Sequence, residues 1–182
     1  MWPRSRAGRV TPTIEPTTPP ERGVVRRSCE ASLTVSASPE AVWDLVTDVG
    51  RVGEWSGECR GCAWIGDVPG PVPGARFRGR NRRGGFRWSR RNVVVTADRP
   101  HTFVWRTVAR PPYPDTVEWH IRLTEDPHGT RVTLSFDVLR MPRLMEWVIS
   151  VAVPAHRDRS ADLAADLRRL ESLLGVTGAT GS

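Results

Sequence analysis

The stretch SCEASLTVSASPEAVW, residues 28–43, joins the two elements whose order decides the fold. Polar and apolar residues alternate from residue 28 to residue 35, which predicts a half-buried strand. Ser38 then provides a helix N-cap, and Pro39 suits the first helical position. Apolar residues at helical spacing continue as far as Val49, and two nearby glycines end the pattern before a second short helical segment. The ordered part of the chain therefore opens with a strand and two short helices.

From Glu58 to Val138 the sequence has the pattern of an antiparallel sheet. Short links rich in glycine and proline separate the apolar segments, as they do in hairpins. The last two segments alternate most clearly, with one apolar face and one polar face. The six predicted strands cover residues 59–66, 75–82, 86–97, 102–109, 115–124 and 130–138.

Two helical patterns close the chain. The first is an apolar stripe, and Pro154 is expected to break or kink the helix after it. The second continues at helical spacing through four leucines as far as Gly175, where a C-terminal cap is expected. The first stripe contains Leu144, Trp147, Val148 and Val151, and the second contains Leu163, Leu167, Leu170 and Leu174.

The 182 residues suffice for one domain with two tails. Residues 1–23 contain five prolines and no hydrophobic period, so we expect a disordered arm there. We expect residues 24–174 to form the domain and residues 175–182 to form a flexible tail. Hydrophobic residues make up 38% of the chain, with eight tryptophans among them, which argues against global disorder.

The sequence also bears on the compartment. It has no apolar run long enough for a transmembrane helix and no apolar segment of the secretory type at its start. Three cysteines make a poor disulfide scaffold. We therefore expect a cytoplasmic protein with reduced thiols.

The order of elements resembles the helix-grip fold of the START-like, or SRPBCC, superfamily. The segment from Ser38 to Trp55 resembles the first-helix signature of its polyketide cyclase/dehydrase and lipid-transport family, in the actinobacterial type. Residues 74–84 with Trp88 are similar to the third and fourth strands of that type, and residues 129–132 resemble the turn into its last strand. The resemblance implies an α+β fold with two short helices after the first strand. A curved antiparallel sheet of about seven strands would wrap around a long C-terminal helix and leave a cavity.

The aromatic residues on the inner strand faces are expected to form the core and, in such a fold, the cavity wall. The resemblance implies binding or transport of a small hydrophobic molecule, a lipid or a polyketide-like compound. It also implies, as the alternative, an enzyme of the polyketide cyclase/dehydrase type. We expect the closing helix to supply the opposite wall. The predicted ligand-binding residues are Trp55, Phe77, Asn81, Trp88, Trp105, Trp119, Trp147 and Val151.

No spacing of residues defines a catalytic set. The chain contains no nucleophile elbow, phosphate loop or HExxH motif. His101, Asp48 and Glu54 are the candidates nearest the expected cavity edge, but Asp48 and Glu54 fit a helix-end charge and a loop charge better. We therefore expect a binding protein more than an enzyme.

The segment Cys59-Arg-Gly-Cys62 has the spacing of half a zinc site or of a redox pair. No second pair of ligands accompanies it, and on an extended strand the two side chains would point to opposite faces. We therefore expect no metal site, no redox role and no cofactor.

All 27 basic residues are arginine, and against 20 acidic residues they give a net charge of +7. Eight of them lie between Ala75 and Ala97, where there is no acidic residue. Four of these occupy alternate positions of one predicted strand and so share a face. Two interpretations stay open: a solvated face paired with acids such as Glu118, or a surface from Arg76 to Arg91 that contacts nucleic acid or an anionic membrane. This arginine stripe consists of Arg76, Arg78, Arg80 and Arg82.

Overall fold

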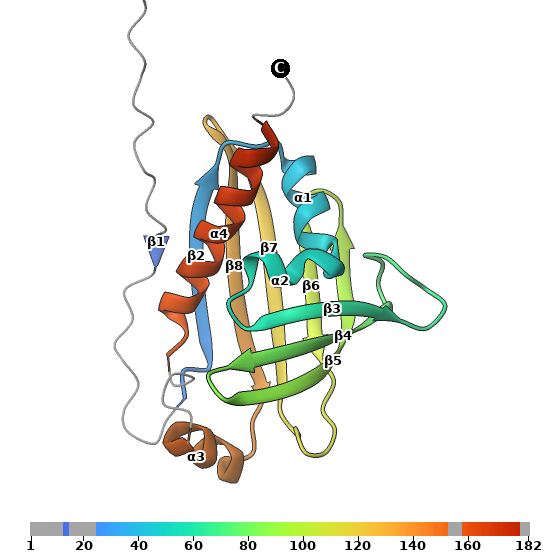
Figure 1. Ribbon diagram of the computed structural model, residues 1–182, viewed down its shortest axis with the longest axis vertical. Coiled ribbons are helices and arrows are strands. Elements are labelled where there is room, and N and C mark those ends of the chain that lie inside the picture. Colours follow the sequence, from blue (N-terminus) through green and yellow to red (C-terminus); the bar gives the residue numbers. More distant parts are fainter. Residues whose placement is uncertain (1–12, 15–24, 153–157, 179–182) are drawn as a thin grey trace, which may run out of the picture.

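The computed structural model describes residues 13–14, 25–152 and 158–178, and it has one curved antiparallel sheet (Figure 1). The strand order is β1-β2-β8-β7-β6-β5-β4-β3. The strands are β1 (Thr13–Ile14), β2 (Ser28–Val35), β3 (Cys59–Ile65), β4 (Arg76–Arg83), β5 (Phe86–Asp98), β6 (Thr102–Thr107), β7 (Thr116–Asp126) and β8 (Gly129–Arg140). The helices are α1 (Pro39–Thr47), η1 (Val49–Arg51), α2 (Val52–Trp55), α3 (Arg143–Ala152) and α4 (Ser160–Gly178).

The helix-grip fold is confirmed, with seven long strands as expected. Strands β3 to β5 cross the view of Figure 1 while β2 and β8 run along it, so the sheet turns through a large angle. Helices α1, α2 and α4 lie against the concave side of this bend. Ser38 caps α1 by accepting a hydrogen bond from the Ala41 N–H at 3.3 Å, and Pro39 is its first residue, as predicted.

The core fills the space between α4 and the sheet. Leu163, Leu167 and Leu170 are each at most 2% exposed and pack in one cluster with Leu33 of β2 and Ile121 of β7. Burial of these leucines on one helix face explains why α4 lies along β2. Part of the concave face of β4–β8 is not covered by α4 and borders a cavity.

Two expectations about the chain ends need correction. The arm predicted to be disordered contains β1, where Thr13 pairs with Ser32 and Ile14 with Ala31; the rest of residues 1–23 lies outside the described residues. Helix α4 continues through Gly175 to Gly178, so the helix does not end at the predicted cap. A C-terminal cap would place Gly175 in a left-handed conformation. Gly175 is not left-handed here, so the helix continues through it.

The predicted wall of Leu144, Trp147, Val148 and Val151 is wrong. These four residues lie on α3 and are between 45% and 73% exposed. Helix α3 is separate from α4 and lies beyond one end of the sheet, at the bottom of Figure 1, with Pro154 outside the described residues. The opposite face of α3 carries apolar residues too, and that face is the one turned inward.

Within the described part of the chain, none of the helices combines the length and the apolar character needed to cross a membrane.

Candidate functional site

A cavity of about 310 Å³ lies inside the bend of the sheet. Its wall comes from the inner faces of β3 to β8, from the loop that contains Asp115, and from α2. Met141, just before α3, and Met145 and Ile149 on its inner face line the cavity, and Arg159 and Asp166 line it from the α4 side. The cavity volume lies at the low end of the ~300–1,000 Å³ typical of small-molecule sites.

Six of the eight predicted ligand-binding residues line this cavity. They are Trp55, Phe77, Asn81, Trp88, Trp105 and Trp119. Trp147 and Val151 do not line it; they lie on the solvent side of α3, 59% and 60% exposed. Met141, Met145 and Ile149 line the cavity instead. They are spaced four positions apart in the sequence, which is a helical spacing that the prediction did not use.

A row of aromatic rings forms the floor of the cavity. Trp105 pairs with Trp119 across β6 and β7, and Trp119 pairs with Phe136 across β7 and β8. The rings of Trp105 and Trp119 stack with centroids 6.0 Å apart and planes inclined by 4°, and the Phe136 ring follows at 5.2 Å. This register places flat apolar surfaces side by side, which suits a ligand with rings of its own.

One buried ion pair borders this floor. Arg90 of β5 donates to both carboxylate oxygens of Asp115 at 2.7 and 2.9 Å, and to the Asp115 carbonyl at 3.0 Å. The Tyr113 ring lies 5.4 Å from the guanidinium of Arg90. The Nε of Arg90 is buried and has no hydrogen-bond partner among the described residues.

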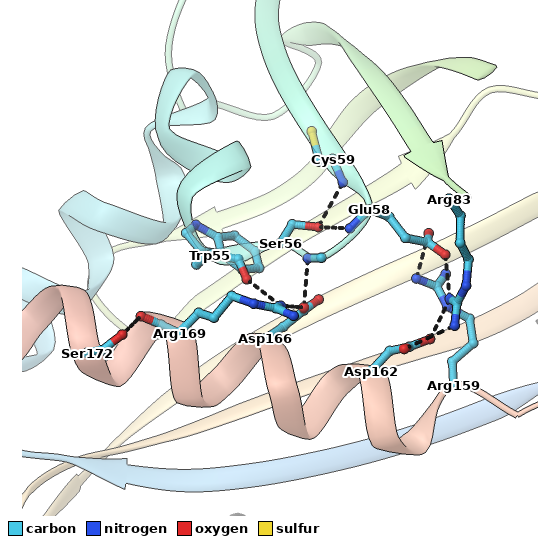
Figure 2. A network of polar contacts seen from close by, with 11 residues as sticks. Trp55, Ser56, Glu58, Cys59, Arg83, Arg159, Asp162, Asp166, Arg169 and Ser172 are labelled. Atoms are coloured by element: carbon cyan, nitrogen blue, oxygen red, sulfur yellow. Dashed lines mark hydrogen bonds and ion pairs between the residues drawn. The ribbon is translucent and has the colours of Figure 1, made fainter. Parts of the chain in front are cut away.

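A second polar cluster lies where α4 begins (Figure 2). Glu58 accepts from Arg83 and from Arg159, both at 2.8 Å, and Arg83 also donates to Asp162 at 2.6 Å. The guanidinium of Arg159 lies 5.0 Å from the centroid of the Trp119 ring, in cation–π contact. Its buried Nε also lacks a partner among the described residues.

Asp166 joins α4 to the loop before β3, as Figure 2 shows. Its carboxylate accepts from the Gly57 N–H at 2.8 Å and from Arg169 at 2.6 Å. Burial raises the pKa of Asp166 to about 6, against the lowering effect of these two donors. Trp55, whose carbonyl oxygen accepts from Arg169 at 3.3 Å, has a buried indole N–H without a described partner.

The structure places His101, Asp48 and Glu54 away from the cavity. His101 is exposed in the turn between β5 and β6, and its N–H bonds to the Asp98 carbonyl at 2.7 Å. Asp48 caps η1 by accepting from the Gly50 N–H. Glu54 pairs with Arg51 on the exposed side of α2. These three residues serve turns and helix ends, so they do not form a catalytic set at the cavity.

The expectation that Cys59 and Cys62 point to opposite faces is wrong. A bulge between Cys59 and Gly61 adds one residue to β3 opposite β4 and restores both side chains to the same face. Their sulfur atoms lie 3.0 Å apart, and both line the cavity. No feature of the sequence marked the bulge beyond Gly61 itself.

The arginine stripe lies on the outer face of the sheet, as expected. All four of its members are exposed, and Arg87 and Arg91 of β5 pair with Arg82 and Arg78 on the same face. The expected pairing with Glu118 is wrong, because Glu118 lies on β7 and binds Arg106. Among the described residues no carboxylate pairs with any of these six arginines, which we call the outer arginine face.

Several solved structures share this fold at low identity. Protein MLL2253 from Mesorhizobium loti is 18% identical with a TM-score of 0.61, covering 83% of this chain and 98% of that one. The major latex-like protein 151 from Panax ginseng is 12% identical with a TM-score of 0.61, covering 81% and 96%. The di-domain ARO/CYC StfQ from the steffimycin biosynthetic pathway is 15% identical with a TM-score of 0.66, covering 87% of this chain and 53% of that one. No curated protein matches the chain.

A family model described as polyketide cyclase/dehydrase and lipid transport matches residues 26–175. These residues include every long strand, α1, α2 and most of α4. The protein therefore belongs to the polyketide cyclase/dehydrase and lipid-transport family.

Proposed function

We propose that this protein binds a small, ring-containing hydrophobic molecule in the cavity. The observation that carries the proposal is the 310 Å³ space whose floor is the row of Trp105, Trp119 and Phe136. Burial of apolar ligand surface on this floor supplies affinity at roughly 25 cal/mol per Å², before the costs of association. The family and the fold support a hydrophobic ligand.

The polar atoms of the cavity favour a ligand that carries oxygen acceptors. Trp55, Arg90 and Arg159 line the cavity, and each has a buried N–H without a described partner. These N–H groups have almost no accessible surface, so a ligand oxygen accepts from one only where its side chain turns toward the cavity. Such a bond removes the cost of about 1–3 kcal/mol of an unsatisfied buried donor, so a carbonyl, phenol or carboxylate oxygen that makes it would strengthen binding. We therefore propose an oxygenated aromatic compound ahead of a plain fatty acyl chain. The similarity to an ARO/CYC structure supports this choice.

A cyclase-type reaction in the same cavity is the alternative. No histidine of the described residues lines the cavity, and its aspartates are already engaged, Asp115 by Arg90 and Asp166 by Arg169. Asp166, with its pKa near 6, is the group that favours the alternative, because it exchanges a proton close to neutral pH. If the protein converts a bound compound, and Asp166→Asn abolishes that turnover without weakening binding, the enzymatic function is favoured over simple binding.

The binding proposal is tested with a matched pair of variants. Asn81 faces the cavity, whereas Ser89 lies exposed on the outer face of the same hairpin. Asn81→Phe fills the cavity and Ser89→Phe does not. We expect Asn81→Phe to weaken binding of hydroxylated naphthalenes and anthraquinones at least ~10-fold, with Ser89→Phe near wild type.

Displacement of anilinonaphthalene sulfonate and native mass spectrometry measure this binding, with fatty acids in the same panel. Saturable binding of one ligand per chain that only Asn81→Phe removes supports the proposal. Equal binding by both variants, or no saturable binding of any compound, contradicts it.

A second candidate function belongs to the outer arginine face: contact with nucleic acid or an anionic membrane. The supporting observation is that six exposed arginines share this face without a described carboxylate partner. If four of them contact phosphates, nucleic-acid affinity falls about 100-fold between about 50 and 200 mM salt. We expect Arg78→Gln with Arg80→Gln to weaken binding of RNA, DNA or anionic vesicles and to reduce the salt dependence. Binding that is absent or insensitive to salt contradicts this candidate.

A further inference from the structure

Cys59 and Cys62 lie side by side in the cavity wall, and the ligand-binding proposal gives them no role. Cys59 is buried, Cys62 is half-buried, and their sulfur atoms are 3.0 Å apart. A disulfide bond is about 2.0 Å long, so a movement of about 1 Å would join them. Backbone geometry sets this approach, because the bulge at Arg60 and Gly61 aims both side chains the same way.

The surroundings fix the backbone at Cys59 and leave space around the Cys62 sulfur. The N–H of Cys59 donates to the Ser56 hydroxyl at 3.1 Å, which fixes the start of β3. Gly79 pairs with Cys62, and a Cβ at Gly79 would lie 3.4 Å from the Cys62 sulfur. The absence of a side chain there leaves the Cys62 sulfur room to turn toward Cys59.

We propose that Cys59 and Cys62 form a reversible disulfide, with small hydroperoxides as the oxidant. The thiolate of Cys59 attacks one peroxide oxygen and breaks the O–O bond, so that the thiolate becomes a sulfenic acid. The leaving alkoxide or hydroxide takes up the proton that Cys59 released and departs as an alcohol or water. The sulfur of Cys62 then displaces hydroxide from that sulfenic acid, and the Cys62 proton and the hydroxide form water. Two thiols and one organic hydroperoxide thus give one disulfide, one alcohol and one water; with hydrogen peroxide a second water replaces the alcohol.

The chemistry of the pair agrees with this order of attack. The hydrogen bond between the two sulfur atoms lowers the pKa of Cys59 to about 7, while the same bond and burial raise the pKa of Cys62. Cys29 differs, since burial raises its pKa and no other thiol lies beside it. In the described part of the chain, no histidine, further cysteine or carboxylate joins the pair as a third ligand of a metal centre.

The test uses the full-length protein and needs no variant to begin. Trypsin cleaves after Arg60, so it separates Cys59, in the peptide of residues 52–60, from Cys62, in the peptide of residues 61–76. The reduced protein is treated with hydrogen peroxide, alkylated under denaturing conditions and digested. We expect the number of free thiols to fall from three to one and the two peptides to remain joined until dithiothreitol is added.

Two variants serve as controls. Cys29→Ser should form the same linked peptide, because its sulfur takes no part. Cys62→Ala should stop at the Cys59 sulfenic acid, which dimedone traps. The proposal is overturned if the linked peptide is absent from peroxide-treated wild type, or if Cys29 appears in the cross-link instead. Neither outcome bears on whether the cavity binds a ligand, so the two proposals fail independently.

Discussion

Asp166 is a carboxylate that the fold takes out of water to tie two elements together. It bridges the Gly57 N–H and Arg169, and its side chain is 12% exposed. Desolvation outweighs both donors and leaves its pKa at about 6. The residue therefore costs the folded state free energy whenever it is ionised, and its hydrogen bonds recover only part of that cost.

This balance predicts how the effect of Asp166→Asn on the free energy of unfolding depends on pH. The pKa is raised from 3.8 in the unfolded chain to about 6 in the folded one, so the folded state holds the proton more tightly. The contribution of protonated Asp166 to the free energy of unfolding is fully present below pH about 4 and is lost as the pH rises through about 6. The total change is about 3 kcal/mol. The free energy of unfolding of the variant, relative to wild type, should therefore rise over that interval.

Urea denaturation across this pH range measures the effect. Asp44→Asn is the control, since its carboxylate is 63% exposed on α1. If the free energy of unfolding depends on pH in the same way for wild type and Asp166→Asn, the Asp166 carboxylate ionises in the folded state as it does in water, and the prediction is wrong.

At the scale of elements, ion pairs hold the start of α4 against the ends of β3 and β4. Glu58 receives Arg83 and Arg159, and its side chain is 14% exposed. Arg159 in turn covers the Trp119 ring of the cavity floor. The same cluster thus fixes a helix end and part of the proposed binding site.

Replacement of Glu58 tests this cluster. Glu58→Gln leaves Arg159 without its carboxylate while the guanidinium stays largely buried, so we expect a loss of about 2–3 kcal/mol in the free energy of unfolding. Glu54→Gln removes a carboxylate that pairs with Arg51 on the surface and should change stability far less. Urea denaturation of both variants decides the point; equal effects would mean that the cluster adds nothing beyond a surface pair.

The same scale shows which elements a sequence can predict. Strands β7 and β8 alternate cleanly because one of their faces meets the core, and their observed bounds lie close to the predicted ones. Helix α3 is apolar on two faces, so periodicity alone could not choose between Trp147 and Met145 for the cavity. The bulge in β3 depends on a single added residue, which leaves no periodic signal.

For the whole molecule, the sheet separates two surfaces of opposite character. The concave face carries the aromatic floor, and the convex face carries the outer arginine face. Alternation along β4 predicted this division, because Phe77 and Arg78 must point to opposite sides. The net charge of +7 therefore describes the outside of the sheet and says little about the cavity.

The polar groups of the cavity escaped prediction for a related reason. Arg159, Glu58 and Asp115 are far apart in the chain and line one cavity only because the sheet bends around α4. Their role depends on which distant residues the folded chain brings together, and the local pattern of the sequence does not encode this. The aromatic residues of the strands were predictable because each one needs only the inward parity of its own strand.

The most direct test of the binding proposal is a crystal structure of the protein with an oxygenated aromatic compound selected by the displacement screen. We predict that its rings lie against Trp105 and Trp119 and that an oxygen atom accepts a hydrogen bond, at about 3 Å, from Arg90, Arg159 or Trp55. A compound bound on the outer arginine face or on α3, with the cavity left empty, would contradict the account.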